Sequence, residues 1–322
     1  MTSIATENRD DPSVDRAPSV TAIIATRGRP ELVRALDAIV DHDYAGPLDV
    51  LVVFDHCEPD PSLGRVERLG DGRTRTVRVL VNEREPGLAG GRNTGLLAAT
   101  GDLVAFCDDD DEWLPGKLTA QVAALDAVPG AKAATAGIEI HYKDRRRVRV
   151  PEPARLTFEG FLHDRQTEAH PSTFLFDRRF LLDEVGMVDE DLPGSMAEDY
   201  DFLLRISRLS PIAVADAPYA AIHWGEASFF SRRWQMSYDA LAHLLDKYPE
   251  FADHPHALGR IRGQQAFALA ALGDGAGARR LARQALALRW ADKRAHLALL
   301  LSTGLVSGEQ AMKVANWFGR GI

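Results

Sequence analysis

The chain has 322 residues, of which 45% are hydrophobic and 26% charged, a composition typical of a globular protein with one large domain and a smaller appendage. Its formal net charge of −9 argues against a nucleic-acid-binding surface, because such a surface neutralises phosphates with clustered lysine and arginine. The two cysteines, Cys57 and Cys107, form no C-x-x-C pair, so neither a disulfide framework nor a structural zinc site is indicated. We expect both to be free thiols.

The first 18 residues are polar and lack the apolar stretch of a signal peptide, so we predict a disordered tail over residues 1–18. No apolar run reaches the roughly 20 residues that a helix needs to span a bilayer. We therefore expect a cytoplasmic protein with no transmembrane segment. The sequence leaves open a peripheral position at the inner face of the membrane.

Short apolar runs alternate with helical patterns between residue 19 and about residue 125. This alternation predicts repeated strand–helix units around a mostly parallel sheet. The predicted strands cover residues 20–25, 50–54, 77–81 and 103–106, and the predicted helices between them cover residues 30–40, 62–69 and 88–99. In open sheets of this kind, ligands gather at the carboxyl ends of the strands.

Beyond residue 131 the pattern is mixed, with a predicted hairpin at 142–150, a strand at 173–176 and a helix at 199–209. After residue 231 the chain is rich in alanine and leucine at helical spacing, and one stretch is similar to a tetratricopeptide hairpin without forming a full array. We therefore predict an α/β domain over residues 19–230 and an all-helical C-terminal extension over 231–322. A homodimer formed through these helices stays open.

Four consecutive aspartates, Asp108 to Asp111, directly follow the predicted strand 103–106. Carboxylates this close together repel one another unless a cation lies among them. Mg²⁺ and Mn²⁺ prefer carboxylate oxygens together with substrate phosphates, and Asp108 and Asp110, two residues apart, are predicted to face the same ion. The alternative is a solvated acidic loop that caps the next helix. A calcium loop fits worse, because it needs glycine where Trp113 stands.

A glycine-rich segment, residues 86–95, enters a predicted helix and brings Arg92 close to backbone N–H groups. It fits neither the G-x-G-x-x-G fingerprint nor the P-loop pattern. A dinucleotide-dependent dehydrogenase and a P-loop NTPase are therefore disfavoured.

Taken in order along the chain, these segments resemble the motifs of the family 2 glycosyltransferases of the GT-A fold. The residues similar to the family's T-x-R-x-x-x-L opening, A-R-N-x-G motif and F-L-D-x-D-D-x-W metal motif are Thr26-Arg27-Gly28-Arg29-Pro30, Gly91-Arg92-Asn93-Thr94-Gly95 and residues 105–113. The second strand ends in Asp55, as in the family, but His56-Cys57 replaces the usual Gly-Ser. The resemblance covers most of residues 19–225 and implies an α/β fold of the GT-A type, a Rossmann-like nucleotide-diphospho-sugar transferase domain.

The resemblance also implies the members of the site. Those expected to bind the nucleotide-sugar are Thr26, Arg27, Arg29, Asp55, Arg92, Asn93, Asp108 and Asp109. Those expected to bind Mn²⁺ or Mg²⁺ are Asp110, Asp108 and His223. For His223, which follows an apolar strand, a purely structural role is as well supported by the sequence as metal binding is.

The resemblance places the catalytic base at Glu198-Asp199, at the start of the predicted helix. A sugar hydroxyl is a poor nucleophile near neutral pH, so a carboxylate within hydrogen-bond reach is expected to take its proton. We assign this role to Asp199, with Glu198 and Asp201 as second choices. The alternative is that these acids only stabilise the helix N-terminus.

The implied reaction is a metal-dependent, inverting single displacement from a nucleotide-diphosphate sugar, with a UDP-sugar favoured. The acceptor, whether saccharide, lipid-linked, natural product or peptide, is not identified by these motifs. A first rival is a sugar nucleotidyltransferase, which would carry a G-x-G-T-R loop near its first strand; this chain has none. A second rival is a non-catalytic protein that binds a nucleotide-sugar.

Overall fold

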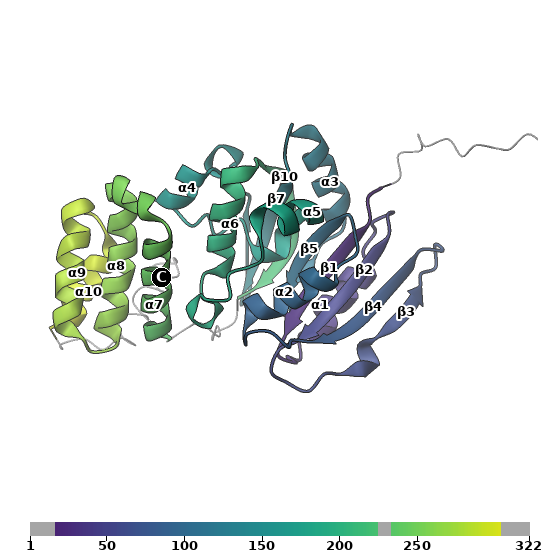
Figure 1. The fold of residues 1–322 in the computed structure, drawn as a ribbon, viewed down its shortest axis with the longest axis horizontal. Helices are drawn as coiled ribbons and strands as arrows, with labels where there is room; N and C mark the ends of the chain where they lie inside the picture. The colour runs from purple at the N-terminus through teal and green to yellow at the C-terminus, as the bar shows by residue number, and fades with distance from the viewer. Residues whose placement is uncertain (1–16, 225–232, 304–322) are drawn as a thin grey trace, which may run out of the picture.

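A mixed sheet forms the centre of the protein, which is described by a computed structural model over residues 17–224 and 233–303 (Figure 1). The strands run in the order β3-β4-β2-β1-β5-β9-β7-β10-β6 across the sheet, and β8 pairs with β7. Their bounds are β1 (Val20–Thr26), β2 (Leu48–Phe54), β3 (Arg65–Arg68), β4 (Thr74–Val81), β5 (Leu103–Asp108), β6 (Glu112–Trp113), β7 (Ala133–Tyr142), β8 (Arg145–Arg149), β9 (Leu175–Asp177) and β10 (Ile212–His223).

The strands β4, β2, β1 and β5 are parallel neighbours, with Val20 of β1 opposite both Leu48 of β2 and Leu103 of β5. Every residue of β1 is buried, as expected for a parallel strand covered on both faces. Because the strands are parallel and in register, their carboxyl ends meet at one edge. That edge brings together the residues that end or follow β1, β2, β4 and β5.

Helices cover both faces of the sheet. Their bounds are α1 (Leu32–Val40), α2 (Leu88–Ala98), α3 (Lys117–Ala127), α4 (Phe158–His163), α5 (Arg178–Phe180), α6 (Glu198–Leu209), α7 (Trp234–Lys247), α8 (Pro255–Ala271), α9 (Gly275–Leu288) and α10 (Lys293–Leu301). Alternation along β1 separates two cores: Ile23 packs with residues of α2 and α6, whereas Ile24 packs with residues of α1 and α3. The N-termini of α2 and α6 therefore belong to the same layer.

The C-terminal helices form a compact group at the end of the molecule farthest from β3 and β4 (Figure 1). Helices α8, α9 and α10 share a core of their own, built mainly from alanine and leucine. The end of α7 and the middle of α8 also contact the sheet domain, because Tyr248 and Ile261 belong to the core that holds α6. The predicted helical extension is thus present and joined to the α/β part.

Most predicted elements are confirmed, and one is wrong. The predicted helix 62–69 is instead a short 3-10 turn, Pro61–Leu63, followed by strand β3, which pairs antiparallel with the edge of β4. Gly64 ends the turn, and the alternating exposure along Arg65–Arg68 is that of an edge strand. The predicted strand 173–176 begins only at Leu175, because a 3-10 turn over Pro171–Thr173 precedes it.

Two predictions concern residues outside the described ranges: nearly all of the tail, 1–18, and the boundary near residue 230. Among the described helices, none combines the length and apolar character that crossing a bilayer requires.

Candidate functional site

The four consecutive aspartates form the turn between β5 and β6, at the carboxyl edge of the parallel strands. Asp108 is the last residue of β5, and the Asp111 N–H donates to the Asp108 carbonyl at 3.2 Å, which closes the turn. Asp109 accepts a hydrogen bond from Thr26 Oγ1 at 2.7 Å, and Asp110 pairs with Arg29 at 2.6 Å. Five predicted site residues are therefore brought together from the ends of β1 and β5 and the loops that follow them.

Asp109, Asp110 and Asp111 are held in an environment that disfavours their ionised form. Burial, followed by repulsion from Asp108, raises the pKa of Asp110 to about 6. Burial and the same neighbour raise the pKa of Asp111 well above its usual value. Burial also raises the pKa of Asp109, against the effect of its bond from Thr26. A cation placed among these groups would remove the repulsion, so the turn is suited to one.

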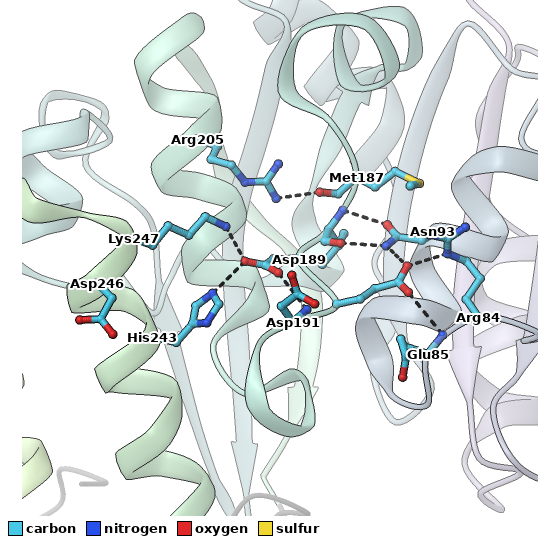
Figure 2. Close-up of a pocket in the computed structure, with 12 residues that line it drawn as sticks. Arg84, Glu85, Asn93, Met187, Asp189, Asp191, Arg205, His243, Asp246 and Lys247 are labelled. Carbon is cyan, nitrogen blue, oxygen red and sulfur yellow. Dashed lines mark hydrogen bonds and ion pairs between the residues drawn. The ribbon is translucent and has the colours of Figure 1, made fainter.

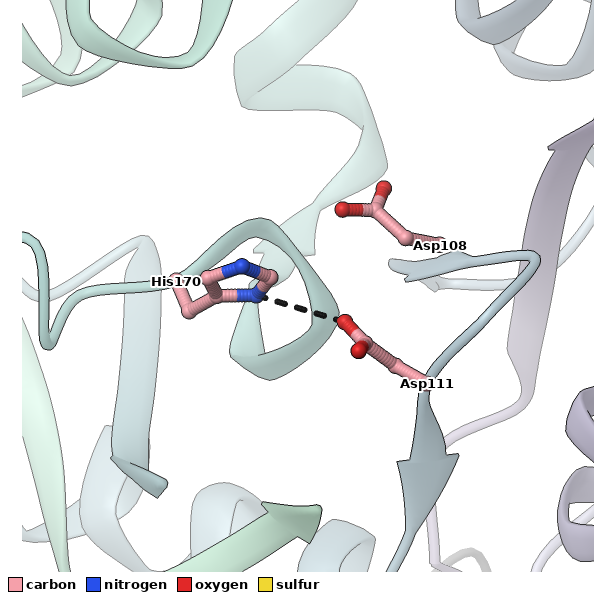
Figure 3. Close-up of side chains that lie close together, drawn as sticks. All are labelled: Asp108, Asp111 and His170. Atoms are coloured by element: carbon pink, nitrogen blue, oxygen red, sulfur yellow. Dashed lines mark ion pairs between the residues drawn. The ribbon is translucent and has the colours of Figure 1, made fainter. Parts of the chain in front are cut away.

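One group of side chains in the described part of the chain can converge on a metal ion: Asp108, Asp111 and His170 each offer a ligand atom within 4.8 Å of the others (Figure 3). His170 Nδ1 lies 3.5 Å from Asp111 Oδ2. Burial lowers the pKa of His170, which favours the neutral imidazole that a metal requires. Sequence reasoning named Asp108 but missed Asp111 and His170 as ligands.

The predicted ligand His223 lies nearby, but its ring faces another partner. It ends β10, which pairs with β6 next to the aspartates. Its Nε2 lies 2.6 Å from Glu112 Oε1, and its ring meets that of His141 edge to face at 4.9 Å between centroids. A metal-binding role for His223 stays a prediction.

The glycine-rich segment positions backbone and side chains at the same edge. Gly87 has a φ of +132°, and its N–H donates to Asp55 at 3.1 Å. A Cβ added there would lie 2.5 Å from Ser195 Oγ, so glycine is required for this close approach. Asp55 is buried and also accepts from Asn82 at 2.7 Å. Its carboxylate is therefore fixed at the end of β2.

Arg92, one turn into α2, joins two acidic segments that are far apart in the sequence. Its Nη2 donates to Asp108 at 2.7 Å, and its Nη1 donates to Glu198 at 2.5 Å. The side chain is buried and lies over the Phe106 ring. The planar guanidinium fork makes this double contact possible, since it presents several donors in fixed directions.

Asn93 and Arg27, two further predicted donor-binding residues, are placed differently. The Asn93 amide exchanges two hydrogen bonds of 2.8 Å with the backbone of Val188 and donates to Glu190 at 2.5 Å. It thereby holds the segment after η4 (Leu181–Val185) against α2. The Arg27 side chain is exposed in the loop after β1.

The predicted catalytic acids occupy the first turn of α6. Burial alone would raise the pKa of Asp199, but Arg165 Nη2 lies 2.6 and 2.8 Å from its two oxygens and holds that pKa below its usual value. Burial and the neighbouring Asp199 raise the pKa of Glu198 to about 7, despite its bond from Arg92. Ala197, just before the helix, has a φ of +66°, an uncommon backbone conformation for a residue with a side chain.

The third acid of this turn, Asp201, is fully buried and bound to the helical extension. It accepts from Tyr248 Oη and from Lys247 Nζ, both at 2.7 Å, and from Arg205 Nε at 3.0 Å. Arg260 of α8 likewise donates to Tyr200 Oη at 2.9 Å. The helical extension thus holds the two residues that follow Asp199.

A cavity of about 670 Å³ lies between residues 187–191 and α7, and Asn93 forms part of its lining (Figure 2). Its wall is made of charged pairs: Asp189 with Lys247 and His243, and Glu190 with Arg84. The aspartates after β5 are absent from its lining.

The chain matches a family model, several proteins of similar sequence and several solved structures of similar fold. The family model described as "Glycosyl transferase family 2" matches residues 21–185. Succinoglycan biosynthesis protein ExoO of Rhizobium meliloti (strain 1021) is 29% identical over 204 residues, which cover 60% of this chain and 56% of that protein. This chain therefore spans little more than half the length of that relative.

Two solved structures share the fold. S. aureus TarS 1–349, in complex with UDP-GlcNAc, superposes with a TM-score of 0.56 at 18% identity and covers 89% of this chain and 91% of its own. The mannosyltransferase PcManGT from Pyrobaculum calidifontis, in complex with GDP-Man and Mn²⁺, gives a TM-score of 0.53 at 20% identity, with coverages of 95% and 89%. The predicted α/β fold of the GT-A type is confirmed.

Proposed function

The chain belongs to glycosyl transferase family 2, and from that premise we propose that it transfers a sugar from a nucleotide-diphosphate sugar to an acceptor, with inversion at the anomeric carbon. A UDP-sugar is the favoured donor, in keeping with the UDP-GlcNAc bound by TarS. The observation that carries the proposal is the double contact of buried Arg92, which joins the aspartate turn to the first turn of α6. This contact supports the proposal because it holds the aspartate turn next to Glu198, the residue that precedes the proposed base.

Donor binding is assigned to the carboxyl edge of the sheet. Asp55 and the loop after β1, with Thr26, Arg27 and Arg29, are proposed to grip the nucleoside, as ligands of open α/β sheets bind beyond the strand ends. Asp108 and Asp109 continue this edge toward the diphosphate. Arg92 is proposed to contact the diphosphate beside its bond to Asp108, because a guanidinium suits phosphate oxygens.

A divalent cation, Mn²⁺ or Mg²⁺, fits the aspartate turn. Asp108 is common to the predicted set, with Asp110 and His223, and to the convergent set, with Asp111 and His170. The raised pKa values of Asp110 and Asp111 support this fit, since burial and mutual repulsion penalise their ionised forms even with Arg29 beside Asp110. When bound, such an ion supplies positive charge against the leaving diphosphate.

Asp199 is proposed as the general base. Its ion pair with Arg165 keeps it ionised at neutral pH, so it can accept a proton from an acceptor hydroxyl. The hydroxyl oxygen forms a bond to the anomeric carbon as the bond from that carbon to the diphosphate oxygen breaks. The proton moves to Asp199, and no covalent enzyme intermediate forms. Glu198, bonded to Arg92, is proposed to position that arginine.

We also propose a domain organisation and a location for the chain. A donor-binding domain covers residues 19–230, and the extension over 231–322 supports α6 through its contacts with Tyr200 and Asp201. The acceptor is a hydroxyl-bearing molecule whose class is open, and so is a homodimer through the extension. A cytoplasmic location at the inner membrane face fits the proposed donor.

Thermal unfolding against a nucleotide panel tests the proposal. We would use UDP, GDP, TDP and CDP, each with and without Mn²⁺, because a ligand at about 100 times its Kd stabilises the folded state by roughly 2.7 kcal/mol. The expected result is a metal-dependent shift with one nucleotide, UDP by preference, that is lost in Asp110→Ala. Asp126→Ala, at an exposed aspartate of α3, is the matched control and keeps the shift. No shift with any nucleotide would contradict the proposal.

A further inference from the structure

The outer part of the helical extension carries a net positive charge, in contrast to the net negative charge of the whole chain. Residues 275–301 contain a single carboxylate, in a chain whose formal net charge is −9. The cationic side chains of this segment are Arg279, Arg280, Arg283, Arg289, Lys293 and Arg294. The one carboxylate, Asp292, is buried and caps α10 by accepting from the Ala295 N–H at 2.9 Å. It also pairs with Arg289 at 3.8 Å, and one carboxylate cannot balance six cations.

The cations follow the solvent-facing side of α9 and the start of α10. Arg279, Arg280 and Arg283 are exposed at helical spacing, whereas Leu281 and Ala282 between them are buried in the core of the extension. Lys293, the first residue of α10, is exposed as well. Within residues 17–224 and 233–303, Arg280, Arg283 and Lys293 take part in no ion pair. Their charges are free to meet an anionic surface.

Trp290 stands in the turn between α9 and α10, beside these cations. Its side chain is 82% exposed, more than that of any other large hydrophobic residue in the described ranges. Exposing a whole indole ring to water is unfavourable, so a partner that covers this ring would gain free energy from its burial. Tryptophan is enriched where an apolar medium meets water, as in the headgroup region of a bilayer.

We propose that α9, the turn at Trp290 and the start of α10 form a docking surface for an anionic phospholipid bilayer, with the indole in the headgroup region and Arg280, Arg283 and Lys293 against lipid phosphates. Charge complementarity points to this partner. The surface lies at one end of the elongated molecule, so the acidic remainder can stay beyond the screening length of roughly 8 Å while that end touches a plane (Figure 1). The proposal goes beyond the transfer reaction and does not depend on it.

A bilayer accounts for both features of the surface, the cations and the protruding indole. A double-stranded nucleic acid would pair with the cations but would leave Trp290 without a contact, because only unpaired bases stack on an aromatic ring. A second copy of the chain, which is acidic elsewhere, is treated as an outcome of the test.

Vesicle co-sedimentation of the full chain tests the proposal. The probes are vesicles of phosphatidylcholine alone and of phosphatidylcholine mixed with phosphatidylglycerol, at low and high salt. The wild type is expected to bind only the mixed vesicles, and less at high salt. Each cation at an anionic surface contributes roughly fivefold to partitioning, so Arg280→Gln with Arg283→Gln lowers binding by about 20-fold or more. Trp290→Ala lowers it also at high salt, where the cations are screened.

A matched control separates this surface from charge in general. Arg145→Gln with Arg147→Gln removes two exposed arginines from β8, far along the chain from α9, and is expected to leave vesicle binding unchanged. Circular dichroism and thermal unfolding verify that each variant is folded. The proposal is overturned if the wild type ignores mixed vesicles, if the α9 variant binds as the wild type does, or if only the β8 variant loses binding. It is also overturned if the α9 substitutions change the oligomeric state and leave vesicle binding intact.

Discussion

Two acidic segments meet at the carboxyl edge of the sheet, and their surroundings differ. In the turn after β5, Asp110 and Asp111 have raised pKa values because they are buried beside other carboxylates. In the first turn of α6, Asp199 has a lowered pKa because Arg165 outweighs its burial. The first segment has more negative charge than its neighbours neutralise, and the second holds an ionised carboxylate in place.

The difference between these segments supports the roles proposed for them. Buried acids whose burial and mutual repulsion outweigh their arginine partner suit a cation that arrives with the substrate, whereas an acid whose arginine partner outweighs its burial stays ionised and can accept a proton. Arg92 contacts both segments, through Asp108 and Glu198. Substitutions in the aspartate turn should therefore impair metal-dependent nucleotide binding, whereas substitutions in the first turn of α6 should lower kcat.

The largest expected effect is that of Asp199→Asn. The amide keeps the size of the side chain but cannot take the acceptor proton, so kcat should fall by about 10²- to 10⁴-fold. Rates are measured as release of nucleoside diphosphate from the donor identified by thermal unfolding. Metal-dependent nucleotide binding should stay as in the wild type. An unchanged kcat, or a larger loss in Glu198→Gln than in Asp199→Asn, would transfer the role of base to Glu198.

Arg92→Lys comes next, because it keeps the charge but removes the planar fork. One ammonium cannot reproduce both contacts, to Asp108 at 2.7 Å and to Glu198 at 2.5 Å. We expect kcat to fall by roughly 10- to 100-fold, an estimate from the worth of a charged hydrogen bond, with the donor KM raised as well. Kinetics at saturating Mn²⁺ measure both parameters. Wild-type values for both would show that the two segments act independently.

Removal of metal gives a pH dependence to which the aspartate turn contributes through Asp110. The folded-state pKa of Asp110, about 6, lies above its usual value of 3.8, so the folded chain holds this proton more tightly than the unfolded chain does. The free energy of unfolding of the chelator-treated protein should therefore decrease as pH rises from about 4 to about 6. Added Mn²⁺ should abolish the decrease, because it favours the ionised carboxylate.

Denaturant unfolding at several pH values, with chelator and then with Mn²⁺, measures this slope. Asp110→Asn should make the slope smaller in the chelator-treated protein, with the remainder due to Asp109, Asp111 and Glu198, whereas Asp126→Asn should leave it unchanged. A slope that is the same in wild type and Asp110→Asn would show that other groups produce it.

The smallest effect is expected for Tyr248→Phe, which separates Asp201 from the proposed catalytic pair. Tyr248 Oη donates to Asp201 at 2.7 Å, and its loss leaves a buried carboxylate with one donor fewer. The free energy of unfolding should decrease by about 1–3 kcal/mol. We expect kcat to fall less than in Asp199→Asn or Arg92→Lys. Tyr238→Phe, on helix α7, which ends just before Tyr248, is the control for removal of a hydroxyl. A loss of kcat equal to that of Asp199→Asn would implicate Asp201 directly in proton transfer.

The sequence predicts those parts of the site whose residues are neighbours in the chain. An apolar run followed by Asp108 to Asp111 locates both the strand and the acidic turn, since strand ends of a parallel sheet share one edge. Glu198 and Asp199 are placed at the start of a helix with clear periodicity, and the resemblance to the family marks them as the predicted base. Both predictions concern residues that are neighbours in the chain.

His170 and Arg165 could not be found in this way. Each lies in the irregular segment after α4 and reaches Asp111 or Asp199 only through the tertiary fold. Neither has a spacing that marks it as a ligand or an ion-pair partner. The strand β3 was missed because four residues of an edge strand, after Gly64, resemble a short amphipathic helix. Pairing with β4, which the sequence does not display, decides its conformation.

The measurement that tests the central claim most directly is a calorimetric titration of UDP into the metal-free chain and into the Mn²⁺-loaded chain, for wild type and Asp108→Asn. Asp108 is shared by the predicted metal set, the convergent set with Asp111 and His170, and the contact with Arg92. The predicted result is that UDP binds the wild type only when Mn²⁺ is present, and that Asp108→Asn weakens this binding by at least about 100-fold, as expected for loss of a metal ligand. UDP binding that is equally strong without Mn²⁺, or unchanged in Asp108→Asn, would contradict the account.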